Sequence, residues 1–366
     1  MLSFNTNKKI KKVLVLMSGG VDSSTAALIL KNEGFDVTGV TMVLFSNSDN
    51  LNEDPNVKDA KMVADFLGIE HITLDLKEKF KKDVIDYFSR EYVCGRTPNP
   101  CVRCNRYIKF GEMLHFTLEN GFDYLSSGHY ANVFYNENLK EWLIKKAPTR
   151  KDQSYVLYNL KQQNLKYILL PLYKFEKSDV RKIAKEHGLP VAEKPESQEI
   201  CFIRGCNYSE FIKNKYNFEP EEGNFIDSKG KVLGKHKGII NYTIGQRRGF
   251  GLSFGKPIYV VNIDREKNTV ILGEEKELFS KGLFAKDVNI ISKKLLPIQE
   301  ERNICIKIRY KSKEALAKIF VFEDEKKDLK AKITFEKSLK SVTKGQAVVF
   351  YKDDILLGGG TIESSF

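Results

Sequence analysis

The sequence predicts an α/β protein in which a doubly wound parallel sheet is followed by two small antiparallel β modules. Strand-like and helix-like segments alternate up to about residue 206, which is the pattern of parallel strands joined by helices. Beyond that point short strand-like runs recur between turn signals, as in small barrels. A glycine-containing loop joins the first strand to the first helix. The expected domains are residues 1–206, 207–282 and 283–366.

The elements of the first domain follow from hydrophobic periodicity and from glycine and proline stops. The predicted strands are residues 12–17, 37–45, 69–76 and 124–127. The predicted helices are residues 25–32, 59–67, 80–92, 110–120 and 176–188. A proline-bearing loop is expected at residues 96–105, between the third and fourth of these helices. This order is the βα alternation of a doubly wound sheet.

The second half is predicted to consist of short strands. They are expected at residues 239–244, 257–263, 269–272, 303–310, 331–335 and 347–351. Turn signals such as Asp227-Ser-Lys-Gly separate them. We expect one or two antiparallel modules, which are typical of small barrels.

Composition is that of a globular protein, with 42% hydrophobic and 30% charged residues among 366. No apolar run approaches the roughly 18 residues that a membrane span needs. The apolar stretch at residues 13–17 is too short for a signal peptide and fits a buried strand. We therefore expect a cytoplasmic protein without membrane association.

The net charge of +12 favours binding to a polyanionic partner. From residue 207 onward there are 30 Lys and Arg against 22 Asp and Glu, so two thirds of the excess lies there. However, Lys outnumbers Arg 48 to 12, which codon bias in an AT-rich genome would also produce. Charge alone leaves both interpretations open.

The loop Ser18-Gly-Gly-Val-Asp-Ser-Ser24 predicts a phosphate-binding site. It follows a strand and opens a helix, so backbone N–H groups and the helix N-terminus can surround phosphate oxygens. The Gly-Lys-Ser/Thr ending of a Walker A loop is missing. The alternative is a tight turn in which Ser or Asp only caps the helix.

This loop resembles that of the PP-loop ATP pyrophosphatase superfamily, whose domain is adenine nucleotide alpha hydrolase-like. The resemblance implies cleavage of ATP between its α- and β-phosphates, with Mg²⁺ bound beside Asp22. It also implies that Met42 packs on adenine. His129 follows a strand end, where α/β sheets bind ligands, so we expect it near adenine or ribose. The nucleotide-binding residues implied by the resemblance are Leu16, Met17, Ser18, Gly19, Gly20, Val21, Asp22, Ser23, Met42 and Gly128.

Five of the six cysteines fall into two clusters, at residues 94–104 and 201–206. A chain without an export signal rarely uses cysteines as a disulfide framework, so the clusters indicate chemistry or a metal. Cys305 alternates like a strand residue and is expected to be buried.

Residues 97–110 and 196–203 resemble the two cysteine segments of the tRNA-specific 2-thiouridylase family. Residues 127–130, 151–155 and 241–249 match further motifs of that family, and the resemblance runs from residue 12 to the C-terminus. It implies adenylation of O2 of wobble uridine 34 in tRNAs for Lys, Glu and Gln. Sulfur would come from a cysteine desulfurase or a relay protein.

The resemblance also implies roles for individual residues. Cys104 would carry a persulfide, and Cys201 would cleave it or resolve the transfer product, with a transient disulfide between them. The implied RNA-contacting residues are Asn99, Pro100, Cys101, Lys151, Asp152, Gln153, Arg309 and Tyr310.

One position departs from the family pattern, because Cys101 stands where the family often has Asp. Two thiols therefore compete for the nucleophile role. We assign it to Cys104, which directly precedes the Asn of the family's Cys-Asn-…-Ile-Lys-Phe motif. Neighbouring Arg96, Arg103 and Arg106 would favour a thiolate, approach RNA phosphate, or do both.

Three alternatives remain at this point. The cysteines could bind zinc or an iron–sulfur cluster, although the second cluster has a four-residue gap and no flanking His; we expect no metal there. The chain could be a small-molecule ligase or amidotransferase, but no glutaminase domain is visible. It could also be a non-enzymatic RNA-binding or metal-binding protein, against which the intact loop argues.

Overall fold

The structure is a computed structural model that describes residues 10–45, 50–195, 200–203 and 205–366. The chain forms two compact units. The first comprises residues 1–81 and 104–197, and the second comprises residues 82–103 and 198–366. The domain boundaries predicted at residues 206 and 282 divide the chain differently and stay a prediction.

The first unit is built on a five-stranded sheet whose pairings are all parallel, in the order β3-β2-β1-β4-β7. Its strands are β1 (Lys12–Leu16), β2 (Asp36–Val43), β3 (Glu70–Asp75), β4 (Tyr124–Ser126) and β7 (Ile168–Leu169). The chain runs outward from β1 to β3 and then returns to β4 on the other side. The topological switch point, where such sheets bind ligands, is therefore at the carboxyl ends of β1 and β4.

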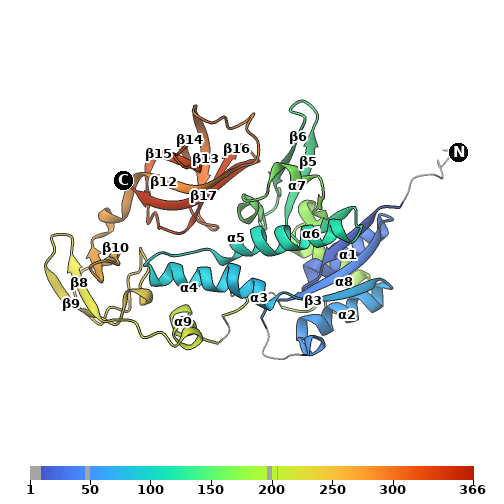
Figure 1. The fold of residues 1–366 in the computed structure, drawn as a ribbon, viewed down its shortest axis with the longest axis horizontal. Helices are drawn as coiled ribbons and strands as arrows, with labels where there is room; N and C mark the ends of the chain where they lie inside the picture. The colour runs from blue at the N-terminus through green and yellow to red at the C-terminus, as the bar shows by residue number, and fades with distance from the viewer. Residues whose placement is uncertain (1–9, 46–49, 196–199, 204) are drawn as a thin grey trace. The chain divides into compact units, whose positions relative to one another are not determined.

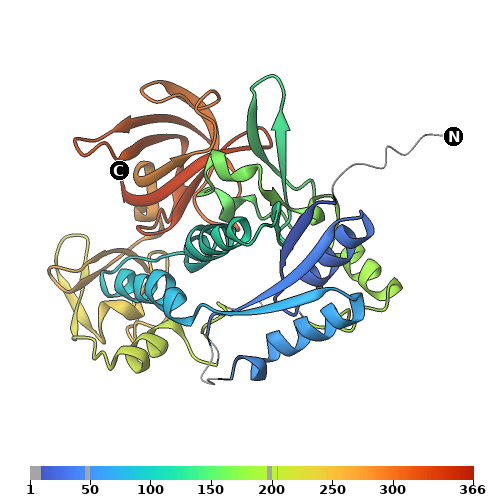
Figure 2. The ribbon, with the colours of Figure 1, turned by 45° about the vertical axis from the view of Figure 1, so that its right-hand side comes forward.

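Helices flank this sheet, as Figures 1 and 2 show. The helices of the first unit are α1 (Val21–Asn32), α2 (Pro55–Leu67), α3 (Lys77–Phe80), α6 (Met113–Glu119), α7 (Gln162–Leu165) and α8 (Lys177–Glu186), with a π-helical stretch at Asn105–Glu112 before α6. Fully buried Val13 and Val15 of β1 pack with Ala27 of α1, Val63 of α2 and Ala184 of α8 in one core. The doubly wound α/β prediction is confirmed.

An antiparallel hairpin, β5 (Ala131–Asn136) and β6 (Glu141–Lys146), follows β4 in the first unit. This hairpin was not predicted from the sequence. Short 3₁₀ segments at Leu51–Glu53, Ser154–Leu157 and Pro171–Lys174 complete this unit. The hairpin delivers the chain from the switch point to residues 151–153.

The second unit contains helices α4 (Asp86–Val93), α5 (Pro100–Cys104, whose last residue lies in the first unit) and α9 (Tyr208–Tyr216). Its smaller sheet has the order β10-β11-β8-β9, with β8 (Gly223–Asp227), β9 (Val232–His236), β10 (Tyr259–Asp264) and β11 (Thr269–Gly273). The β8–β9 and β10–β11 pairs are antiparallel, and β11 pairs with β8 in parallel. Phe225, Tyr242 and Val260 lie in the core of this module.

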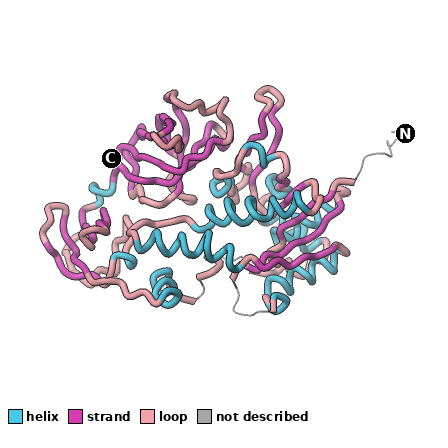
Figure 3. The backbone as a smooth tube through the Cα atoms, viewed as in Figure 1, coloured by secondary structure: helices cyan, strands magenta, loops and turns pink. Residues whose placement is uncertain are grey.

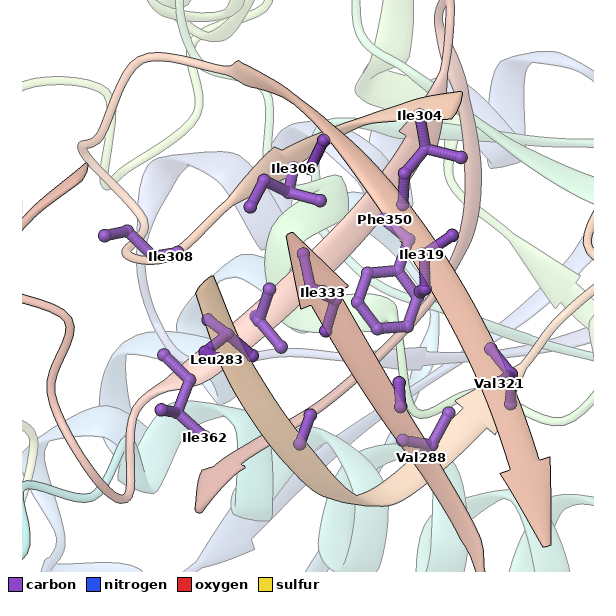
Figure 4. Close-up of a cluster of buried hydrophobic side chains, with 14 of the residues drawn as sticks. Leu283, Val288, Ile304, Ile306, Ile308, Ile319, Val321, Ile333, Phe350 and Ile362 are labelled. Atoms are coloured by element: carbon purple, nitrogen blue, oxygen red, sulfur yellow. The ribbon is translucent and has the colours of Figure 1, made fainter. Parts of the chain in front are cut away.

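The C-terminal strands gather in a barrel, drawn in magenta near the C-terminus in Figure 3. Their order is β12-β15-β14-β13-β16-β17, and β12 also pairs with β17, which closes the barrel. They are β12 (Phe279–Ile290), β13 (Glu301–Lys307), β14 (Ala315–Glu323), β15 (Leu329–Lys340), β16 (Ala347–Lys352) and β17 (Ile355–Ser365). Alternate residues point inward, so Ile306, Ile319, Ile333 and Phe350 meet in a core with no exposed surface (Figure 4).

Three expectations were wrong. Residues 239–244 do not form a strand, because Ile239–Asn241 is a 3₁₀ helix that begins at Gly238 with a φ of +93°. The loop predicted at residues 96–105 is helical from Pro100 onward, because proline suits the first helical turn and Asn99 caps it. Cys305 lies on β13 but is partly exposed, since its neighbours Ile304 and Ile306 take the inward positions.

Among the described residues, none of the helices is both long and apolar enough to cross a membrane.

Candidate nucleotide and sulfur-transfer site

The predicted nucleotide loop connects β1 to α1 at the switch point. Gly20 occupies the N-cap position of α1, where no side chain caps the helix. The first backbone N–H groups of α1 therefore keep their capacity to bind an anion. Leu16, Met17 and Val21, at the two ends of the loop, are buried and anchor it in the core.

The serines of the loop brace it internally. Ser23 Oγ donates to Gly20 O at 3.1 Å and accepts from Ser18 N at 3.1 Å. Ser24 Oγ donates to the same Gly20 carbonyl at 2.9 Å. Ser23 and Ser24 are buried, whereas Ser18 is exposed. Ser18 is thus the loop hydroxyl that a ligand reaches directly.

Asp22 faces two partners from other elements. Its Oδ1 atom accepts from Tyr130 Oη at 2.6 Å and from Lys177 Nζ at 2.6 Å. Tyr130 is fully buried after β4, and Lys177 is the first residue of α8. The other carboxylate oxygen, Oδ2, accepts no hydrogen bond from the described residues. An oxygen ligand of this kind suits Mg²⁺.

Gly128 lies directly against the loop. A Cβ atom at this position would come within 2.9 Å of both Ser23 N and Asp22 C. Only glycine lets the chain after β4 approach the loop backbone this closely. The structure therefore brings together Gly128 and the Ser18–Ser23 loop, as the resemblance implies.

His129 follows Gly128 and is buried. Its Nδ1 atom lies 2.8 Å from Ser127 Oγ, and its ring centroid lies 5.7 Å from that of Phe110. Burial, and secondarily the charge of Lys109, lowers the pKa of His129 well below its usual value. The ring is therefore neutral at pH 7 and suits stacking or hydrogen bonding rather than proton transfer.

A second histidine fixes the backbone before the loop. Thr41 Oγ1 donates to Met17 O at 2.9 Å, so it must accept from His71 Nε2, which lies 2.8 Å away. Burial, followed by the charge of Lys61, lowers the pKa of His71. Met42, the next residue of β2, is half-buried.

The segment at residues 151–153 is a structured turn. Asp152 Oδ1 accepts from Ala147 N and Ser154 N, each at 3.1 Å. Gln153 Oε1 accepts from Tyr130 N at 3.1 Å, and Gln153 N donates to Tyr130 O at 2.8 Å. Gln153 is thus joined to the tyrosine that contacts Asp22. Lys151 is partly exposed.

The segment that carries Asn99, Pro100 and Cys101 is held by the barrel. Thr97 N donates to Lys344 O at 2.9 Å, and Gln346 Nε2 donates to Thr97 O at 2.9 Å. Asn99 Oδ1 accepts from Cys101 N at 3.1 Å and from Val102 N at 3.3 Å, and so caps α5.

The thiols differ in accessibility. Cys101 and Cys201 are exposed, and Cys104 is buried with 8% of its surface accessible. Phe202 is buried between Phe88 of α4 and Phe211 of α9, with ring centroids 5.3 Å from each. This packing fixes the backbone beside Cys201, while residues 196–199 of the predicted motif lie outside the described residues.

The three arginines near the first cluster have partners of their own. Arg96 forms a bidentate pair with Glu91 at 2.7 and 2.6 Å, which raises the pKa of Arg96. Arg103 lies 4.1 Å from the centroid of the Tyr87 ring, and Arg106 lies 5.0 Å from that of Tyr107. Arg96 is therefore held in place by Glu91, and its effect on a neighbouring thiolate stays a prediction.

Arg309 and Tyr310 follow β13 and are exposed. Arg309 Nη2 donates to Lys340 O at 3.3 Å, and Tyr310 is 37% exposed beside Lys307. In the 241–249 motif, Arg247 and Arg248 are exposed. Within the described ranges, no three His, Cys, Asp or Glu side chains come together as a metal site.

Sequence reasoning missed two lysines that contact the loop. Lys177 reaches Asp22, and Lys194 Nζ lies 2.9 Å from Gly19 O. No motif surrounds either residue. For Lys177 the sequence showed only a lysine at the second position of the helix predicted at residues 176–188.

Family models match almost the whole chain. A model described as tRNA methyl transferase HUP domain matches residues 11–205, and one described as tRNA methyl transferase PRC-barrel domain matches residues 209–274. An aminomethyltransferase beta-barrel domain model matches residues 280–362. The parallel sheet, the loop at its switch point and the HUP match define a PP-loop protein of the ATP-using class.

Similar curated proteins identify the family within this class. A tRNA-specific 2-thiouridylase MnmA of Acetivibrio thermocellus is 49% identical over 362 residues, covering 96% of this chain and 99% of the relative. The protein of that name from Clostridioides difficile is 47% identical over 363 residues, covering 97% and 99%. The chain therefore belongs to the tRNA-specific 2-thiouridylase family.

A solved structure, a predicted subunit of tRNA methyltransferase from Methanocaldococcus jannaschii, overlaps 48% of this chain and 77% of its own. The identity is 22% and the TM-score is 0.32.

Proposed function

We propose that this chain is a tRNA-uridine 2-sulfurtransferase that uses ATP to replace O2 of wobble uridine 34 with sulfur. The observation that carries the proposal is its similarity to 2-thiouridylases over nearly the full length of both chains. The reaction class is therefore group transfer to RNA.

The first step forms an adenylate. Uridine O2 attacks the α-phosphorus of ATP, and the bond to pyrophosphate breaks. The uncapped N-terminus of α1 and the backbone of Ser18–Ser23 support binding of the phosphates at this point. Adenylation converts a carbonyl oxygen, which leaves poorly, into the oxygen of AMP, which leaves readily.

Mg²⁺ fits this site because Asp22 Oδ2 accepts no hydrogen bond from the described residues. Asp22 would hold the ion together with phosphate oxygens, and the ion would offset the charge that develops on pyrophosphate. The chain's own contribution is to hold the Asp22 carboxylate through the hydrogen bond from Tyr130 Oη.

The second step transfers sulfur. The terminal sulfur of a Cys104 persulfide attacks C2, AMP leaves, and Cys201 then attacks Cys104 Sγ, which releases 2-thiouridine and leaves a Cys104–Cys201 disulfide. Alternatively, Cys201 attacks the persulfide first, and the freed hydrogen sulfide attacks C2. Either route leaves the disulfide, which a thiol reductant must return to two thiols by supplying two electrons.

The remaining assignments follow from the family resemblance. The substrates would be tRNAs for Lys, Glu and Gln, and the sulfur donor a cysteine desulfurase or relay protein. Residues Asn99, Pro100, Cys101, Lys151, Asp152, Gln153, Arg309 and Tyr310 would contact tRNA. Gln153 is supported by its bond to Tyr130, which would connect a bound base to the nucleotide site. An activity on tRNA implies a cytoplasmic location.

Mass spectrometry of tRNA nucleosides tests the proposal. Cells that lack the protein should lose 2-thiouridine, and the purified chain with ATP and a persulfide donor should restore it. Cys104→Ser and Cys201→Ser should abolish thiolation but keep RNA-dependent pyrophosphate release. Cys94→Ser and Cys206→Ser, which are matched in chemistry, should retain activity. Full thiolation by Cys104→Ser would refute the nucleophile assignment.

A further inference from the structure

Two lysines from outside the nucleotide loop contact it at separate points. Lys177 Nζ lies 2.6 Å from Asp22 Oδ1, and Lys194 Nζ lies 2.9 Å from Gly19 O and 2.5 Å from Asp59 Oδ2. The Lys177 side chain is 13% exposed and that of Lys194 is 34% exposed. Both ammonium groups are thus partly removed from water beside the loop.

The surrounding structure holds each lysine in place. Lys177 begins α8, whose Val180 and Ala184 are fully buried. The backbone of Lys194 is tied down by Arg181, whose Nη2 donates to Lys194 O at 3.2 Å. These contacts hold the backbone of each lysine. The point from which each side chain extends is therefore fixed, whichever partner its ammonium group contacts.

Stability of the fold does not account for this arrangement. Taking an ammonium group out of water costs free energy that a single ion pair often only balances. Asp22 already accepts a hydrogen bond from Tyr130. Lys194 has the Asp59 carboxylate as its ion-pair partner, yet it also reaches Gly19 O, a neutral acceptor that needs no cation. Two cations at the rim of a loop built to bind anions are instead suited to a polyanionic ligand.

We propose that Lys177 and Lys194 bind the β- and γ-phosphates of ATP and retain the pyrophosphate leaving group. This assignment rests on the proposed function, because it requires that the loop bind ATP. Two ammonium groups offset part of the charge of a triphosphate that backbone N–H groups alone leave unbalanced. AMP carries neither the β- nor the γ-phosphate, so it gains nothing from either lysine.

Equilibrium binding of ATP, inorganic pyrophosphate and AMP to the full chain, measured by calorimetry with Mg²⁺, tests the assignment. Lys177→Met and Lys194→Met should each weaken pyrophosphate and ATP binding at least about tenfold. AMP binding should change less than about twofold. Arg at either position should recover part of the loss, because the charge is kept. Lys11→Met removes an exposed pair with Asp123 in the same unit and should change nothing.

The outcomes separate the two proposals. Equal losses for AMP and pyrophosphate would show that the lysines only support the shape of the loop, and would overturn the assignment. Unchanged pyrophosphate binding in both variants, with wild-type ATP binding intact, would overturn the lysine assignment alone. A wild-type chain that binds no ATP would overturn the proposed function and this assignment together. Urea unfolding of each variant confirms that it is folded.

Discussion

Gly128 lies so close to the loop backbone that a methyl group added at this position would disrupt the nucleotide site. A Cβ atom would meet two backbone atoms, Ser23 N and Asp22 C, at 2.9 Å. Backbone atoms at the start of α1 cannot rotate away as the end of a flexible side chain can. The cost of a substitution therefore appears at the nucleotide site itself.

We expect Gly128→Ala to weaken ATP binding about tenfold or more and to lower the free energy of unfolding by about 1–3 kcal/mol, as overpacking does. Calorimetry with ATP and urea denaturation measure the two effects. Gly34→Ala is the control, because a methyl group added at Gly34 would meet no atoms within 4 Å apart from its neighbours in sequence, although the φ of Gly34 is +87°. Gly34→Ala should lower stability and leave ATP binding unchanged; equal ATP binding in both variants would contradict the argument.

His129 should make stability depend on pH. Burial lowers its pKa well below the usual 6.5, so below pH 6.5 the unfolded chain binds a proton that the folded chain does not. The free energy of unfolding should therefore fall as pH drops from 7.5 to 5, with up to about 2 kcal/mol from this residue. Urea titrations of wild type and His129→Gln measure the effect, and the variant should show the shallower slope. His115→Gln, at a histidine 68% exposed, should keep the wild-type slope.

At the scale of elements, Asn99 at the start of α5 combines a structural role with a proposed functional one. Asn99 is proposed to contact RNA, yet its Oδ1 atom also caps the helix by accepting from Cys101 N and Val102 N. A helix of five residues depends strongly on such a cap. The RNA role and the capping role can be separated because aspartate caps as well as asparagine does.

Asn99→Ala should lower the free energy of unfolding by about 1 kcal/mol, whereas Asn99→Asp should leave it within about 0.5 kcal/mol of wild type. If the amide also contacts RNA, both variants should lose thiolation, since aspartate cannot donate a hydrogen bond and carries a negative charge. Denaturation curves and thiolation assays on the same preparations provide both readouts. Full thiolation by Asn99→Asp would limit Asn99 to capping.

Elements with a strong hydrophobic period were predictable from the sequence, and those fixed by local caps were not. After Lys12, β1 is a continuous apolar run typical of a buried strand, and β1 and β2 were placed within two residues of their observed ends. By contrast, Ile239–Asn241 is apolar like a strand but turns at Gly238 into a 3₁₀ helix. The β5–β6 hairpin has mixed polarity on both faces, so no alternation marked it.

The site was predictable where it follows a motif and not where it depends on tertiary approach. Ser18–Ser24 and Gly128 are adjacent, as the order of β1 and β4 in the sheet requires. Lys194 lies 175 residues from Gly19 in sequence, and only the folded chain brings its ammonium group to the loop. Likewise, nothing in the sequence indicated that Arg96 pairs with Glu91.

At the scale of the whole molecule, the net charge of +12 is the sum of many side chains, and their combined field attracts a polyanion. Many lysines in both units have acidic neighbours, as in the Lys185–Glu193 pair at 2.7 Å. Arg247 and Arg248 are exposed side by side in the basic second unit, and no ion pair joins either to an acidic side chain in the described part of the chain. These two residues are therefore strong candidates for backbone phosphate contacts.

Affinity for tRNA should fall steeply as salt rises, because each phosphate contact releases counterions. Arg247→Ser with Arg248→Ser should weaken binding at least about tenfold at 0.15 M salt and reduce the slope of log K against log salt by about one to two. Filter binding or fluorescence anisotropy at about 50 to 300 mM salt measures both the affinity for tRNA and its dependence on salt. Lys182→Ser with Lys185→Ser is the matched control, because Glu186 and Glu193 already balance those charges. An unchanged slope in the arginine variant would place the RNA backbone elsewhere on the protein.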